Sequence, residues 1–573
     1  MHFQPPLDDI HFILHEVLKA PKQLQSLDCF ADTDADLMRQ VVDEAGKFVA
    51  EVVAPLQVIG DAVGCQWVDG AVVTPPGFRD AYQAFWRNGW PALACDPEDG
   101  GQGLPAVLEA VLFEMLSGAN HGWTMAPGLL HGAYECIRHH GSSQLKTQYL
   151  EKVASGEWLA TMCLTEAHAG SDLGLVRTRA LVQPDGSYAL SGSKIFISGG
   201  EHDLSENIVH LVLARLPDAP AGPKGLSLFL APKFLPDGRR NAVQCDRIEE
   251  KMGLHGSPTC AMRFEEATGW ILGEPNRGLN AMFVMMNAAR LHVALQGLGL
   301  LEAAWQKADA YARERRQMRA PGPRNAAEVC DPIVQHPAMQ RILDTQRAWI
   351  DGGRVLTYRT AIELDMAKHH PDAARRASAQ RWCALATPVL KAALTHQAFY
   401  GASECLQVFG GHGYVREWGI EQIVRDARVA MIYEGTNEIQ AIDLLLRKVL
   451  VDGGAALSAL LRELDAEFDG HSAADVAVRS RFAQLHQLTQ TLVEAAKADP
   501  LLPYRVADEY LRLLALALLG WAWTRIEAAA GDLPRWRAPA ALHNRVLPEF
   551  DMWIKTLTAQ CSAPTANNGA SDE

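Results

Sequence analysis

The chain has 573 residues and a formal net charge of −15. Its length exceeds what one hydrophobic core can hold and predicts three or four domains of roughly 100–200 residues each. The acidic balance argues against nucleic-acid binding, which requires a basic surface. Eleven cysteines without zinc or redox spacing predict reduced thiols, a cytoplasmic chain and no metal site.

Two stretches bear on secretion and membranes. The segment MHFQPPLDDIHFILHEV lacks a basic stretch followed by an apolar one, so no secretory signal is expected. The most apolar run, at 511–523, is too short to cross a bilayer and contains Arg512. We therefore expect a buried helix there and no stable membrane insertion.

Residues 1–160 predict one helix after another, because apolar residues recur every three or four positions. The spacing of the apolar residues changes at residue 161. From there to 272, alternating apolar residues, β-branched residues and Pro/Gly/Asp turns predict a compact antiparallel β domain.

Helical periodicity resumes over 273–454 and predicts a helical bundle. One long amphipathic helix is expected over 279–317, followed by a Pro-rich surface loop over 318–337. Further helices are expected at 335–369, 372–398 and 399–410.

The last part of the chain, 455–573, predicts an extra helical domain and a frayed tail, the tail covering 562–573. The four domains expected are therefore 1–160, 161–272, 273–454 and 455–573.

A short joint within the bundle carries the main functional signal. Helical spacing breaks at Tyr433-Glu434-Gly435-Thr436, and a second amphipathic run follows with Thr436 or Asn437 as its expected N-cap. Glu434 thus lies between two helices among apolar or small neighbours. Such surroundings raise the pKa of a carboxyl group and suit it to act as a general base. Without further context, a lone Glu in a turn is more often a solvated residue.

Arg425-Asp426 followed by Ile432-Tyr433-Glu434-Gly435-Thr436 resembles the C-terminal signature of the acyl-CoA dehydrogenases, whose catalytic base is the Glu of that motif. The order of helical domain, β domain and helical bundle is also that of this family. The resemblance implies a mainly α fold: an N-terminal helical domain, a β-barrel-like middle domain, a C-terminal four-helix bundle and an added C-terminal helical region.

Four other segments resemble the parts of the family that bind FAD: 162–172, 193–200, 313–317 and 407–414. The last two are the segments that reach the flavin nucleotide, the glycine turn doing so in a neighbouring subunit. Taken singly, the four have ordinary structural explanations as a turn, a strand, a basic helix end and a helix C-cap. The cofactor-binding residues that the resemblance implies are Met162, Leu164, Thr165, Phe196, Ser198, Arg315, Gln407, Gly411, Thr436 and Glu438.

The substrate-binding residues implied in the same way are Ser171, Asn287, Arg290, Tyr433 and Gly435. The chain departs from the family at several of these segments. Ala167-His168 replaces a common Pro-Gly, and Phe196 and Ser198 stand where many members have Trp and Thr. Pro258-Thr259 and the added C-terminal region point to the branch that includes 3-methylmercaptopropionyl-CoA dehydrogenase-like proteins.

The resemblance implies an enzyme that introduces a double bond between Cα and Cβ of an acyl-CoA thioester, either a fatty acyl-CoA or one like 3-methylmercaptopropionyl-CoA. Glu434 would take the Cα proton, an electron-transfer flavoprotein would accept the electrons, and the enzyme would be a homodimer or homotetramer. The sequence leaves the acyl chain length open.

Three alternatives stay open. One is a DNA-associated flavoprotein of the alkylation-response branch, although the region after 455 has more acids than bases. Another is an acyl-CoA oxidase that uses O₂ directly. The third is a helical scaffold that has lost its flavin, against which the intact Glu434, Thr165 and Arg315 argue.

Overall fold

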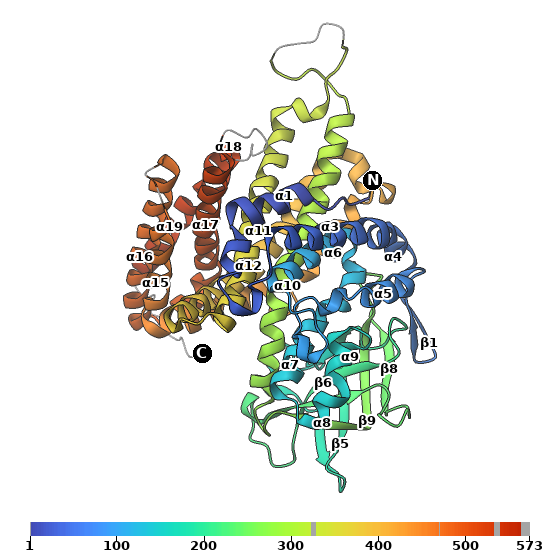
Figure 1. Cartoon of the computed structure of the whole chain (residues 1–573). Coiled ribbons are helices and arrows are strands. Elements are labelled where there is room, and N and C mark those ends of the chain that lie inside the picture. The colour runs from blue at the N-terminus through green and yellow to red at the C-terminus, as the bar shows by residue number, and fades with distance from the viewer. Residues whose placement is uncertain (1, 323–327, 469, 471, 532–538, 563–573) are drawn as a thin grey trace, which may run out of the picture.

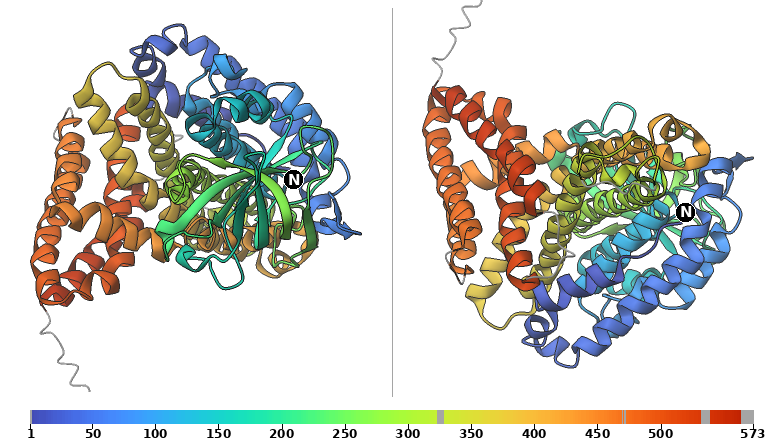
Figure 2. Two further views of the ribbon diagram at one scale, coloured as in Figure 1. Left: turned by 90° about the horizontal axis from the view of Figure 1, so that it is seen from below. Right: turned by 90° about the horizontal axis from the view of Figure 1, so that it is seen from above.

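The structure, a computed structural model, describes residues 2–322, 328–468, 470, 472–531 and 539–562, without the side chain of Asn287. Helices from both halves of the chain form the main body, and a β domain lies at one end of it (Figure 1). The helices that follow residue 454 pack along one flank of this body (Figures 1 and 2). The mainly α architecture with a central β domain is confirmed.

The N-terminal helices cover the long helices of the bundle. The principal ones are α3 (Ala35–Phe48), α4 (Gln57–Val63), α5 (Phe78–Arg87), α6 (Ala106–Thr124) and α7 (Leu130–His140). Helix α6 is buried almost throughout and packs against two long helices of the bundle, α10 (Gly278–Glu314) and α11 (Pro337–His369). Its backbone departs from helical geometry at Asn120 (φ −159°, ψ 87°), so its last turn runs in a different direction.

A β-hairpin interrupts the first 160 residues, where only helices were expected. Its strands are β1 (Gln66–Val68) and β2 (Ala71–Val73). Asp69 and Gly70 form the turn with φ values of 50° and 83°. Asp-Gly between short β-branched runs is a common hairpin signal.

The middle domain is a seven-stranded sheet: β3 (Leu159–Cys163), β4 (Arg179–Val182), β5 (Tyr188–Ser198), β6 (Ile208–Arg215), β7 (Leu226–Pro232), β8 (Val243–Ile248) and β9 (Thr259–Leu272). Strands β6, β4, β5, β9 and β7 pair in that order, and β7 pairs again with β6, so they close into a barrel. Most of these pairings are antiparallel, as expected, but the expectation is wrong at two strands, because β3 and β4 both run parallel to β6.

Three long helices form the frame of the bundle: α10 (Gly278–Glu314), α11 (Pro337–His369) and α12 (Ala373–Val408). The two helices expected at 372–398 and 399–410 are one continuous helix. Gly401 within this helix allows close packing against α10 and α11, because a Cβ there would approach the side chains of Leu301 and Gln346 to 2.5 and 2.4 Å. The shorter α13 (Ile420–Arg428) and α14 (Asn437–Ile442) pack on α12.

The C-terminal region contains α15 (Ala455–Ala466), α16 (Ala473–Ala498), α17 (Leu502–Ala530) and α19 (Pro548–Ser562). Helix α17 extends beyond the run at 511–523 on both sides, and its 29 residues are long and apolar enough to cross a membrane by length and composition alone. Its burial is confirmed, since 78% of its apolar window is buried inside the protein. The expected tail lies, after Ser562, outside the described residues.

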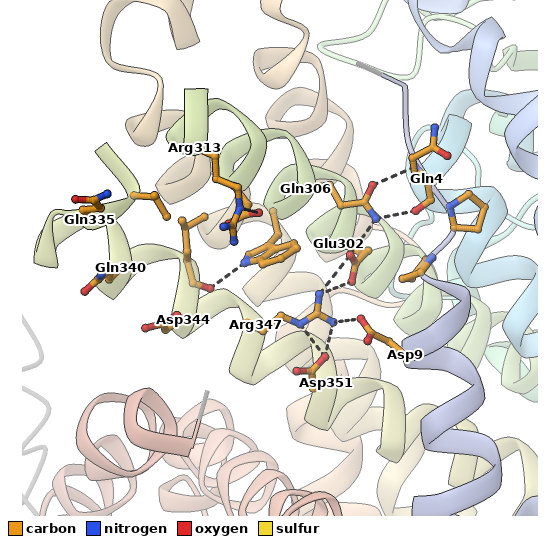
Figure 3. A pocket seen from close by; sticks show the side chains of 16 residues that line it. Gln4, Asp9, Glu302, Gln306, Arg313, Gln335, Gln340, Asp344, Arg347 and Asp351 are labelled. Carbon is orange, nitrogen blue, oxygen red and sulfur yellow. Dashed lines mark hydrogen bonds and ion pairs between the residues drawn. The ribbon is translucent and has the colours of Figure 1, made fainter. Parts of the chain in front are cut away.

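Buried ion pairs join the N-terminal helices to the bundle. Arg354 is fully buried and donates to Glu114 of α6 at 2.5 Å and to Glu302 of α10 at 3.0 Å. Arg347 lies between Glu302, Asp9 and Asp351 at the edge of a cavity of about 940 Å³ (Figure 3).

Candidate active site

The predicted joint is a sharp bend between α13 and α14. Glu434 and Gly435 both have left-handed backbone angles, with φ values of 55° and 84°. Gly adopts such angles freely, whereas for Glu they are uncommon and strained. Of the two N-caps considered for α14, the structure has Thr436, whose hydroxyl accepts a hydrogen bond from the Ile439 N–H at 3.3 Å. Glu438 lies in the first turn of this helix and is exposed.

The electrostatics of the bend suit a general base. Loss of hydration raises the pKa of Glu434 to about 7, although the cationic groups of Arg290 and Lys391 favour its charged form. Arg290 reaches the site from α10 and Lys391 from α12. A carboxyl group that titrates near 7 can take a proton at neutral pH.

Several side chains fix the backbone around Glu434. The Lys391 ammonium donates to the Gly435 carbonyl at 2.7 Å, and the Gln440 amide donates to the Glu434 carbonyl at 3.3 Å. On the preceding residue, the Tyr433 hydroxyl donates to Gln296 Oε1 at 2.5 Å. Each residue of the bend is therefore tied to a neighbouring helix.

The bent end of α6 places the bend near the β domain. The Tyr433 hydroxyl lies 3.4 Å from His121 Nε2 and 3.6 Å from Met125 Sδ. On the other side of this segment, a Cβ at Gly199 would lie 3.8 Å from that of Ala126. Strand β5 ends at the residue before Gly199, so its end and the Glu434 bend flank the same short segment, which runs from the last turn of α6 to Ala126.

Phe196 is an aromatic residue on the outside of the barrel, 60% exposed and with φ at 59°. The pairing of β5 with β9 shifts register between Lys194 and Ile197, which are both buried. Ser198 is half-buried, and the buried Ile197 lies between it and Phe196. The ring and the hydroxyl therefore share the outer face of the strand.

The Thr165 segment is held against this strand. The Ile195 N–H donates to the Thr165 carbonyl at 2.9 Å, and the buried Lys194 ammonium donates to the Leu164 carbonyl at 2.9 Å. Lys194 also pairs with Glu166 at 2.9 Å. Met162 is buried in β3 immediately before this segment. This places Thr165 close to the aromatic face at Phe196.

Two further residues of the C-terminal signature join the domains. Arg425 pairs with Asp61 of α4 at 2.6 Å. Asp426 accepts a hydrogen bond at 2.6 Å from the N–H of Leu254, in the turn before β9. Burial raises the pKa of Asp426 to about 6. Helix α13 thereby fixes the orientation of the bend relative to both other domains.

A second surface gathers the residues expected to reach the flavin nucleotide. Tyr311 stacks on Phe409 with ring centroids 4.3 Å apart and bonds His412 Nδ1 at 2.9 Å. This contact brings the exposed Arg315 and Gln407 into one region with Gly411. A Cβ at Gly411 would meet nothing within 4 Å, so packing within the chain does not require a glycine there.

The two surfaces are separate within one chain. Arg290 lies on α10 and Arg315 directly follows the last residue of that helix, 25 residues later, which corresponds to about 37 Å at 1.5 Å per residue. Of the other expected substrate residues, Ser171 is exposed on a loop of the β domain. Asn287 lies on α10, but its side chain is outside the described residues.

Three models of known families match the chain in order: the N-terminal domain of acyl-CoA dehydrogenase over residues 36–157, its middle domain over 161–267 and its C-terminal domain over 276–449. The chain is also 39% identical to 3-methylmercaptopropionyl-CoA dehydrogenase of Ruegeria pomeroyi, over 98% of this chain and 97% of that protein. The chain belongs to the acyl-CoA dehydrogenase family. The expected oxidoreductase class and family branch are confirmed.

Two other proteins resemble this acyl-CoA dehydrogenase along most of its length. The broad-specificity linear acyl-CoA dehydrogenase FadE5 of Mycobacterium tuberculosis is 34% identical over 92% of this chain and 90% of its own. The acyl-CoA dehydrogenase of Bacillus anthracis, solved in complex with FAD, has a TM-score of 0.74 and 20% identity, covering 94% of this chain and 91% of that one. The coverage shows that the added C-terminal region belongs to the shared fold.

Sequence reasoning missed Lys391, Gln296 and the Lys194–Glu166 pair at the site of this acyl-CoA dehydrogenase. The sequence could have identified Lys391, since it is the only charged residue in the run ATPVLKAALT of α12. A lone cation on an otherwise apolar helical stretch predicts a buried and paired ammonium group. The other three depend on contacts between distant elements.

Proposed function

We propose that this protein is an FAD-dependent acyl-CoA dehydrogenase in which Glu434 removes the Cα proton of an acyl-CoA thioester. The observation that carries the proposal is the Glu434 carboxyl group, with a pKa raised to about 7 on a strained bend that three helices hold in place. A strained, desolvated acid at a helix joint is typical of a functional site rather than of a solvated turn.

Glu434 acts twice in this proposal. Its carboxylate takes the Cα proton, and its backbone N–H stabilises the charge that develops on the thioester oxygen. Arg290 and Lys391 keep a fraction of Glu434 ionised at neutral pH, because their charges oppose the effect of burial. Entry of an acyl chain removes water from the base and strengthens these interactions.

The residues present fit a flavin. Thr165, the exposed ring of Phe196 and the hydroxyl of Ser198 form a face on which a flat ring can lie, close to the segment that contacts Tyr433. A flavin held there would supply the oxidising chemistry by accepting a hydride from Cβ. The FAD complex of the Bacillus anthracis relative supports this assignment.

We assign the second surface to the nucleotide part of the flavin of a neighbouring subunit. Arg315 offers a planar guanidinium for pyrophosphate oxygens, and Gly411 permits close approach of the backbone. Gln407 lies on the same exposed region. The distance from Arg290 within one chain supports a homodimer or homotetramer, in which a second copy completes each site.

The names of the relatives guide the choice of substrate. They support a linear acyl-CoA or a thioether-containing acyl-CoA such as 3-methylmercaptopropionyl-CoA. We further propose that electrons pass to an electron-transfer flavoprotein and that the enzyme acts in the cytoplasm.

The test is Glu434→Gln, with Glu417→Gln on the exposed turn before α13 as the matched control. We expect Glu434→Gln to retain yellow flavin and to lose dehydrogenation with a dye acceptor by at least 10³-fold, while the control keeps full activity. An acyl-CoA chain-length series then defines the substrate. Substantial activity in Glu434→Gln would overturn the proposal, and oxygen consumption without an added acceptor would favour an oxidase.

A further inference from the structure

Lys391 is a buried cation beside the proposed base. Lys391 lies on α12 and is fully buried. The ammonium donates to the Gly435 carbonyl at 2.7 Å and to Asn437 Oδ1 at 3.0 Å. The Asn437 amide in turn donates to the Ala392 carbonyl at 3.1 Å. Helix α12 therefore holds the chain on both sides of Thr436.

Burial of an ammonium group is costly, so its presence calls for a reason. Burial lowers the pKa of Lys391 to about 7, while the carboxylates of Glu434 and Glu438 favour its charged form and the cation of Arg290 opposes it. A neutral amide could make the same hydrogen bond to Gly435 without this cost. What the ammonium adds is a positive charge next to the Glu434 carboxyl group.

The bend itself needs support. Glu434 has φ at 55°, a strained angle for a residue with a side chain, and such angles persist only where surrounding contacts fix them. The hydrogen bond from Lys391 acts on the next peptide group, that of Gly435. The contact from Gln440 to the Glu434 carbonyl is longer, at 3.3 Å.

We propose that Lys391 is a positioning residue for the catalytic carboxylate: its hydrogen bond fixes the Glu434–Gly435 bend, and its charge favours the ionised form of Glu434. This proposal rests on the function proposed above, in which Glu434 is the base. It assigns two separable contributions to one side chain, a donor and a charge.

Three substitutions separate the contributions. Lys391→Met removes both, Lys391→Gln keeps an amide donor without the charge, and Lys391→Arg keeps the charge with a different donor geometry. Loss of the charge raises the pKa of Glu434, so the rise of kcat/KM with pH moves to higher pH, by roughly one unit. We expect this shift in the Met and Gln variants and not in the Arg variant.

The measurements are kcat and KM as functions of pH, with flavin absorbance and the thermal unfolding midpoint of each variant. We also expect kcat at saturating pH to fall about 10-fold or more in the Met variant and less in the Gln variant, which retains a donor. Lys497→Met, at an exposed position of α16, is the control for loss of a lysine.

Two results would overturn the proposal. One is a pH profile in the Gln and Met variants that coincides with that of the wild type. The other is an equal loss of activity, flavin and unfolding midpoint in all three variants without a shift, which indicates a purely structural lysine. If Glu434→Gln stays active, the proposed function fails. If that variant is inactive and Lys391→Gln is unshifted, only the role of Lys391 fails.

Discussion

The hydroxyl of Tyr433 donates a 2.5 Å hydrogen bond to Gln296 Oε1 on α10, so the residue directly before the proposed base is fastened to the longest helix of the bundle. Gln296 is buried, with 8% of its surface exposed. The bond therefore lies where few water molecules can replace it.

Removal of this hydroxyl should affect both folding and catalysis. We expect Tyr433→Phe to lower the free energy of unfolding by about 1–3 kcal/mol, because Gln296 Oε1 loses its donor. We expect kcat to fall several-fold as the bend loosens. Chemical denaturation and steady-state kinetics measure the two effects. In a double-mutant cycle with Gln296→Leu, the effects should be clearly non-additive, and simple additivity would contradict the coupling.

The activity should depend on pH through Glu434. The base works in its deprotonated form and its pKa is about 7, so we expect kcat/KM to fall as pH drops below 7. A profile that stays flat down to pH 5 would show that the carboxyl group is not desolvated in the free enzyme.

The same raised pKa affects stability. Between pH 4.5 and 7 the folded protein binds more protons at Glu434 than the unfolded chain, so stability falls as pH rises through this window. We expect Glu434→Gln to raise the free energy of unfolding at pH 8 by about 1–2 kcal/mol and to have little effect at pH 4.5. Denaturation curves at the two pH values measure the difference. An equal change in the free energy of unfolding at pH 4.5 and at pH 8 would contradict this dependence of stability on the protonation of Glu434.

The buried pair of Arg354 and Glu114 should be necessary for stability. We expect Glu114→Ala to cost about 3–5 kcal/mol, because it leaves a fully buried guanidinium with one fewer carboxylate. Replacing both residues by Met should recover part of the loss. The thermal unfolding midpoint is the measurement. The exposed pair of Lys497 and Glu494 is the control, whose removal should cost under about 1 kcal/mol.

A substitution at Gly411 tests the second surface, which we assigned to the nucleotide part of the flavin. Gly411→Ala should leave the unfolding of the chain unchanged, because a Cβ there meets nothing within 4 Å, yet weaken FAD binding by about 10-fold or more. Gly413→Ala is the contrasting variant, since its Cβ would lie 2.5 Å from the Leu406 carbonyl and should destabilise the fold itself. Flavin titration and calorimetry distinguish them. Unchanged FAD affinity in Gly411→Ala would argue against the assignment.

Local patterns predicted much of the fold. The long helix α10, the α13–α14 joint and the Thr436 cap all follow from spacing and capping residues close in sequence. The hairpin at Asp69-Gly70 had a local signal that the surrounding helical pattern concealed. The parallel pairing of β3 with β6 had none, because it joins Met162 to Leu211, about fifty residues away.

The residues of the candidate site also fall into those with a local sequence signal and those without one. Glu434 is recognisable because a carboxylate interrupts helical periodicity among apolar residues. Its partners Lys391 and Gln296 come from helices 40 to 140 residues earlier in the sequence, and only tertiary packing brings them together. Sequence reasoning can therefore identify a base, while the groups that tune it require the fold.

Helix α17 limits how the enzyme can be shortened or assembled in the cell. The Trp523 indole bonds the Ala348 carbonyl of α11 at 2.8 Å, and a Cβ at Gly352 would lie 2.4 Å from Leu519. During synthesis, this face of α11 stays exposed until the ribosome has made residues 502–530. A chain truncated after the catalytic bend would therefore expose this apolar surface and aggregate, and would not be a minimal enzyme.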